Sequence, residues 1–147
     1  MNIIRVTKEF RWEMSHALWQ YDGLCKNIHG HSYIMQVTVK GSVSENKTSP
    51  TYGMVIDFGS LKSIVNSTIV TIFDHSLVLY KESPHAFSSP DLFERLHILD
   101  FQPTAENLVS YFAKRITEKL PKDISLYKLR LYETATSFAE WYSNDNL

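Results

Sequence analysis

Two histidines separated by one glycine, His29 and His31, follow the single cysteine of the chain, Cys25, in the stretch CKNIHGHSY. The residues after them alternate between apolar and polar, which predicts a β-strand. In an extended chain, residues two positions apart point to the same side. Both imidazoles are therefore expected on one face, where neutral rings can bind a metal ion together.

A third histidine, His16, ends an earlier alternating stretch over residues 3–16 and continues its apolar side. If the two stretches pair antiparallel, the end of the first meets the start of the second, and the three rings converge. Three histidines with an open fourth position are typical of a catalytic zinc site. The alternative for each histidine alone is a packed side chain with an ordinary hydrogen-bond partner.

Four further residues carry chemistry, and each has a plainer alternative. Cys25 is either a small buried side chain or a thiolate made more acidic by a nearby metal or imidazolium. Asp74 can orient the neighbouring His75 only if the backbone turns there; otherwise His75 is a surface residue after a helix. Glu133 is either exposed or a carboxylate that binds the amino group and ring N–H of a flat ligand.

The elements that position these residues follow from hydrophobic periodicity. Four strands are predicted: residues 3–16, about 29–40, 125–133 (with Tyr127, Leu129 and Leu131 on one face) and 138–142. One helix is expected after a cap at Ser60 and another after a cap at Thr104, whereas residues 74–102 are predicted to be irregular. This order predicts an α+β fold in which a four-stranded antiparallel sheet carries two helices on one face.

Length and composition restrict the class of protein further. The chain has 147 residues, a formal net charge of −1 and no run of lysine or arginine, which does not favour a nucleic-acid partner. We see no signal peptide or membrane span, and a lone cysteine cannot form an intramolecular disulfide. We therefore expect one cytoplasmic domain over residues 1–147, with no membrane partner.

Six segments together resemble the 6-pyruvoyltetrahydropterin synthase/6-carboxytetrahydropterin synthase family. They are FRWEMSHAL, CKNIHGH, GMVIDF, FDHSL, PTAEN and YETATSFAEWY, and they span nearly the whole chain. The resemblance implies the tunnelling fold, in which three subunits close their sheets into a barrel and two trimers stack into a hexamer. Active sites in this family lie between subunits, so Asp74 and His75 are expected to serve the zinc site of a neighbour.

The resemblance also implies a role for each residue. The zinc ligands would be His16, His29 and His31. Cys25 would transfer protons on the substrate side chain, and His75 would move protons while Asp74 orients it. Glu133 would anchor the amino group and ring nitrogen of a pterin, with Thr104 at the ring edge.

The family acts on 7,8-dihydroneopterin triphosphate, with zinc as a Lewis acid on the side-chain hydroxyls. ETATSFAEWY and PTAEN resemble the bacterial branch, which forms 6-carboxy-5,6,7,8-tetrahydropterin, acetaldehyde and triphosphate for queuosine and 7-deazaguanine synthesis. The alternative is the pyruvoyl product of the biopterin branch, formed by loss of triphosphate alone. The sequence does not identify the residues that hold the triphosphate; Lys26 is a candidate by position, although surface lysines are usually only solvated.

Two functions outside the family also fit the histidines. A zinc hydrolase acting through zinc-bound hydroxide would need neither Cys25 nor Glu133. A non-catalytic pterin- or purine-binding module with a structural zinc would unfold when the metal is chelated, whereas a catalytic zinc should leave the fold largely intact.

Overall fold

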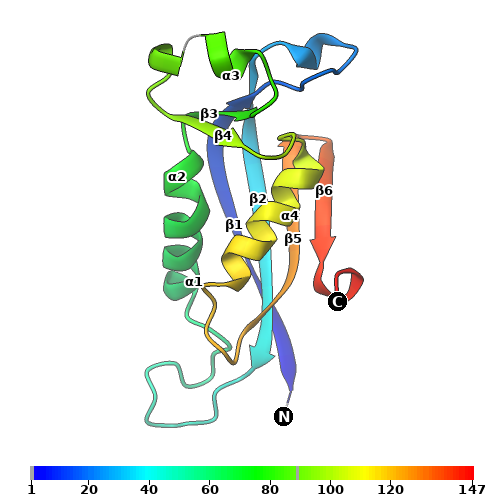
Figure 1. Cartoon of the computed structure of the whole chain (residues 1–147). Coiled ribbons are helices and arrows are strands. Elements are labelled where there is room, and N and C mark those ends of the chain that lie inside the picture. Colours follow the sequence, from blue (N-terminus) through cyan, green and yellow to red (C-terminus); the bar gives the residue numbers. More distant parts are fainter. Residues whose placement is uncertain (1, 89) are drawn as a thin grey trace.

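The computed structural model describes residues 2–88 and 90–147, in which helices cover one face of a six-stranded sheet (Figure 1). The strands are β1 (Ile3–His16), β2 (His29–Ser42), β3 (Ser76–Tyr80), β4 (Leu96–Leu99), β5 (Ser125–Thr134) and β6 (Ser137–Tyr142). Their order in the sheet is β4-β3-β1-β2-β5-β6. The predicted α+β class is confirmed, and so is the antiparallel pairing of β1 with β2, β2 with β5, and β5 with β6.

The short strands β3 and β4 correct two predictions, the four-stranded sheet and the irregular segment over residues 74–102. They pair parallel with each other, and β3 pairs parallel with the last three residues of β1. The first four residues of β3 are all buried, so its sequence has no alternation. A run of five residues without alternation does not distinguish a strand from other buried structure. The short helix α3 (His85–Ser88) lies between the two strands.

Two helical segments pack against the same face of the sheet (Figure 1). The first comprises α1 (Phe58–Val65), a π-helical turn (Asn66–Val70) and α2 (Thr71–Phe73). Asp57 rather than Ser60 caps its start, because the Asp57 carboxylate accepts the Ser60 backbone N–H. The second is α4 (Ala105–Thr117), which begins after the predicted cap Thr104; the Thr104 hydroxyl accepts the Asn107 backbone N–H at 3.2 Å.

The core lies between these helices and the apolar side of β1, β2 and β5. β1 and β2 pair in unbroken register, from Ile3 opposite Ser42 to His16 opposite His29. In β5 the register shifts, so that Tyr127 has no partner in β2 and Leu126 occupies the buried position that was predicted for Tyr127. In residues 2–88 and 90–147, no helix has the length and apolar character needed to cross a bilayer.

Candidate functional site

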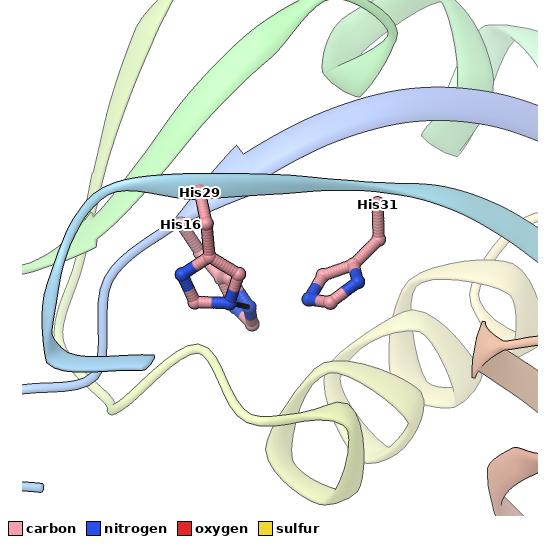
Figure 2. Close-up of side chains that lie close together, drawn as sticks. All are labelled: His16, His29 and His31. Carbon is pink, nitrogen blue, oxygen red and sulfur yellow. Dashed lines mark hydrogen bonds between the residues drawn. The ribbon is translucent and has the colours of Figure 1, made fainter. Parts of the chain in front are cut away.

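Three histidines converge at one end of the β1–β2 pair (Figure 2). The register sets His16 opposite His29, and His31 opposite Met14 on the same helix-covered face. The ring centroids lie 4.6 to 5.1 Å apart. One ligand atom from each ring lies within 4.8 Å of the other two. We call these three residues the histidine group; their convergence was predicted from strand parity and is confirmed.

Backbone carbonyls fix the tautomers of two rings in the histidine group. His16 Nδ1 lies 2.7 Å from the carbonyl oxygen of Pro103, and His29 Nδ1 lies 2.7 Å from that of Asn27. Because a carbonyl oxygen only accepts, each Nδ1 carries the proton and donates it. In the neutral imidazole, each Nε2 then presents a lone pair, which is the arrangement that outer hydrogen bonds give to metal-binding histidines.

The donor set of the histidine group fits a metal ion. The Nε2 atoms of His16 and His29 lie 3.1 Å apart, and in these tautomers neither carries a proton to place between them. His31 Nε2 is buried without a hydrogen-bond partner among the described residues. Burial lowers the pKa of His16 to about 4 and also lowers the pKa of His31, so both rings are neutral at pH 7. A cation that prefers imidazole nitrogen, such as Zn²⁺, would satisfy all three nitrogens.

Glu133 reaches the histidine group from β5. Its Oε1 lies 3.4 Å from His16 Nε2 and 3.7 Å from His31 Nε2, and 28% of its side chain is exposed. The carboxylate is therefore neither fully exposed nor fully buried. It lies beside the ring nitrogens, within reach of any group held next to a metal there.

The Asp74–His75 pair lies at the edge of β1 that faces β3. The backbone turns as the pair requires, because His75 adopts the left-handed φ of 59° that is uncommon outside glycine. His75 Nδ1 lies 2.9 Å from Asp74 Oδ1. The backbone of Glu13 holds the turn: its N–H donates to Asp74 Oδ1 at 3.0 Å, and its carbonyl accepts the His75 N–H. We call Asp74 and His75 the dyad.

The dyad is more exposed to solvent than the histidine group. The hydrogen bond from the Glu13 N–H is the main cause that lowers the pKa of Asp74, and His75 and Arg95 lower that pKa further. The His75 side chain is 74% exposed. It borders a pocket of about 550 Å³ that Glu13, Ser15 and Ser32, on the polar side of the β1–β2 pair, also line. His31 of the histidine group also lines this pocket, but neither Asp74 nor His75 is among the residues whose ligand atoms converge in that group.

Cys25 lies in the short turn Leu24–Lys26 between β1 and β2 and is partly buried. Its carbonyl accepts the Leu18 N–H at 2.9 Å, which ties this turn to the end of β1. Its sulfur does not belong to the histidine group. The carbonyls of Asn27 and Pro103 were not predictable from the sequence, because a backbone atom has no residue type by which to recognise it.

The fold is similar to that of solved pterin synthases. The crystal structure of the uncharacterised protein WS1659 from Wolinella succinogenes has a TM-score of 0.79 at 20% identity, covering 97% of this chain and 99% of that one. The 6-pyruvoyl tetrahydropterin synthase from Plasmodium vivax has a TM-score of 0.73 at 16% identity, covering 96% and 98%. At these identities the likeness concerns the fold, which is the tunnelling fold that the motifs implied.

A sequence model described as 6-pyruvoyl tetrahydropterin synthase matches residues 5–144. The chain belongs to this family. A protein from Haemophilus influenzae, named 6-carboxy-5,6,7,8-tetrahydropterin synthase, is 34% identical over 143 residues, covering 95% of this chain and 99% of the relative. A Pyrococcus horikoshii protein, named putative 6-carboxy-5,6,7,8-tetrahydropterin synthase, is 33% identical over 148 residues, covering 91% and 85%. These names belong to the branch that the sequence motifs favoured.

Proposed function

We propose that this chain, as one pterin synthase domain over residues 1–147, is a cytoplasmic zinc-dependent lyase of queuosine biosynthesis. It converts 7,8-dihydroneopterin triphosphate to 6-carboxy-5,6,7,8-tetrahydropterin, acetaldehyde and triphosphate. The observation that carries the proposal is the histidine group, in which three imidazoles converge and His31 Nε2 is buried with no hydrogen-bond partner among the described residues. The names of the curated relatives support the carboxy product over the pyruvoyl alternative.

The histidine group would hold the metal, and a bound zinc ion would supply Lewis acidity to hydroxyl groups of the substrate side chain. Glu133 would accept hydrogen bonds from the pterin, whose amino group and ring N–H match the two oxygens of a carboxylate. Because Glu133 lies 3.4 Å from His16 Nε2, its contact holds the ligand close to the ring nitrogens. The Thr104 oxygen accepts the Asn107 N–H, so its own proton remains to donate to the ring edge.

Proton transfer would fall to Cys25 and the dyad. With Nδ1 donating to the Asp74 carboxylate, His75 Nε2 carries a lone pair that can accept a proton from the substrate side chain. Asp74 also stabilises the imidazolium that this transfer creates. Cys25 would exchange the second proton as a thiol or thiolate.

A second copy of the chain would bring the dyad and the histidine group together. Only Met14–His16 of β1 pair with β3, so the rest of that edge has no strand partner among the described residues. The outer edge of β6 is likewise unpaired in the described sheet. Open edges pair readily with other strands, and exposed Ile3 and Phe138 add apolar surface at the two edges. We infer a trimer closed through these edges, or a hexamer of two trimers.

The test is a product assay with zinc-loaded protein and 7,8-dihydroneopterin triphosphate. Mass spectrometry of the pterin and an enzymatic acetaldehyde assay should show the 6-carboxy product with an equal amount of acetaldehyde. A pyruvoyl product without acetaldehyde would establish the alternative, and no turnover by the loaded protein would refute a lyase. Light scattering should give three or six times the 17.0 kDa chain mass, and a mass of one chain would contradict the oligomer.

A further inference from the structure

A second pocket, of about 300 Å³, lies between the loop that connects β1 to β2 and the turn that follows β3. Both segments lie at the end of the molecule that carries α3 (Figure 1). Lys26 and Asn27 line the pocket from the loop, and Ser83 and His85 line it from the turn. No carboxylate is among the described residues of the lining. An ammonium group with an imidazole and no acidic neighbour in the wall suits an anion.

The wall of this pocket is continuous with the histidine group. Asn27 lines the pocket, and its carbonyl accepts the hydrogen bond from His29 Nδ1 at 2.7 Å. Lys26 directly follows Cys25 in the same turn. In 7,8-dihydroneopterin triphosphate, the phosphates are attached to the last carbon of a three-carbon side chain whose other two carbons carry hydroxyls. A substrate with these hydroxyls at the histidine group can therefore extend its phosphates along this loop.

The loop is held in one conformation by a side chain from the segment before α4. The Gln102 amide brackets the Trp19 backbone, accepting its N–H at 3.0 Å and donating to its carbonyl at 2.7 Å. The next residue, Gln20, has a φ of 64°. Among the described non-glycine residues, only Gln20 and His75 adopt positive φ. Such conformations persist where surrounding contacts impose them, and they concentrate at functional sites.

The larger pocket beside the dyad is less suited to an anion. Its arginine, Arg95, already donates to the backbone carbonyls of Thr71, Ile72 and Asp74. Two carboxylates, those of Glu13 and Glu94, also line that pocket. In contrast, the Lys26 ammonium has no ion pair with any described residue. The unpaired charge therefore lies in the smaller pocket.

We propose that the pocket lined by Lys26 and His85 binds the triphosphate of the substrate, and that Gln102 holds its wall in place. This assignment rests on the proposed function, because it takes the substrate to be a pterin triphosphate. Lys26 contributes a point charge to the phosphate oxygens, and His85 contributes a ring N–H donor.

The test compares two ligands that differ only in their phosphates, 7,8-dihydroneopterin and its triphosphate. Binding is measured by pterin fluorescence in zinc-loaded Cys25→Ala protein, which should not turn over. Adding Lys26→Gln or His85→Gln should each weaken binding of the triphosphate about tenfold and leave binding of dihydroneopterin within about twofold. Unchanged binding of dihydroneopterin would thus show that the variants are correctly folded. Lys47→Gln, in the loop at the opposite end of β2 (Figure 1), removes the same charge and should change neither affinity.

Failure of this assignment is distinguishable from failure of the proposed function. If the parent protein forms the 6-carboxy product but both variants bind the two ligands as Cys25→Ala protein does, the phosphate site lies elsewhere and the lyase stands. If no product forms but the preference for the triphosphate form depends on Lys26 and His85, the pocket stands and the lyase fails. In the Cys25-intact enzyme, Lys26→Gln should raise KM about tenfold with little change in kcat.

Discussion

The histidine group and the dyad are built in different ways. The three histidines are set by an unbroken register between two strands of 14 residues each, and His16 is fully buried. The dyad is set by one left-handed residue, His75, and by two hydrogen bonds to the backbone of Glu13, and it is open to solvent. The first is a largely buried site made from regular structure; the second is a turn held at a strand edge.

This difference matches the chemistry that each part can perform. Burial lowers the pKa of His16 and so keeps its lone pair available to a metal at neutral pH. Hydrogen bonding lowers the pKa of Asp74 and so keeps a carboxylate beside an imidazole that can exchange protons with solvent. In the proposed function, one chain holds the metal, and a second chain supplies the acid–base pair at that metal.

The largest expected effect is loss of the metal from His16→Ala protein. Removal of one of three imidazoles leaves too few protein ligands, so metal content should fall from about one zinc ion per chain to none, and activity should fall to background. Elemental analysis after dialysis measures this. His97→Gln is the matched control, because His97 bonds to the Ile72 carbonyl outside the group and should keep the metal. One bound ion per chain in His16→Ala protein would contradict the assignment.

Changes in the dyad should separate catalysis from metal binding. His75→Ala should lower kcat by about 10²- to 10⁴-fold, the usual contribution of a general acid or base, with metal content unchanged. Asp74→Asn should lower kcat less, because the imidazole remains but loses its orienting carboxylate. Both kcat and zinc content are measured on the same preparations. Loss of zinc from His75→Ala protein would contradict the separation of catalysis by the dyad from metal binding by the histidine group.

Mixed oligomers test whether the dyad acts on the site of another chain. Cys25→Ala and His75→Ala proteins should each be inactive alone. If they are dissociated and reassembled in equal amounts, about a quarter of the sites should contain both intact residues, because half of the chains carry each one. The measurement is activity of the reassembled mixture relative to reassembled parent protein. No recovery, with both proteins confirmed in one oligomer, would place the dyad at the site of its own chain.

Titration of His16 should make the stability of the metal-free protein depend on pH. The pKa of His16 is about 4 in the folded state against 6.5 as its ordinary value, so the unfolded chain binds the proton more readily in this range. The free energy of unfolding should therefore decrease as the pH falls from about 6.5 to 4. This residue should account for roughly 3 kcal/mol of that decrease. Urea unfolding at several pH values measures the trend, and His16→Gln should flatten it. An equal slope in both proteins would exclude His16 as the cause.

Residues in long regular elements were predictable from the sequence, and residues at irregular points were not. The alternation over residues 3–16 fixes the face of His16, and the spacing of His29 and His31 fixes theirs, so their convergence required only one assumed pairing. The prediction that Tyr127 lies on the buried side of β5 was wrong, because the register shift depends on how β5 pairs with β2. Local composition carries no sign of that shift.

Two other differences arise because several residues satisfy the same local rule. Asp57 and Ser60 are both good helix caps three residues apart, and only the backbone geometry shows that Asp57 accepts the Ser60 N–H. The relation of the dyad to the histidine group depends on distant packing. The sequence predicts that Asp74 and His75 can pair if the chain turns, but not on which edge of β1 the pair lies.

The smallest expected effect tests whether the start of α4 supports the histidine group. Thr104→Ala removes the side-chain acceptor of the Asn107 N–H and should lower the free energy of unfolding by about 1 kcal/mol. Thr104→Ser keeps the acceptor and should restore most of the lost free energy of unfolding.

Because Pro103 precedes this cap and its carbonyl orients His16, the alanine variant should also bind zinc several-fold more weakly, as competition with a chelator would show. A lower free energy of unfolding with unchanged zinc affinity would instead show that Thr104 acts on stability alone, as a helix cap.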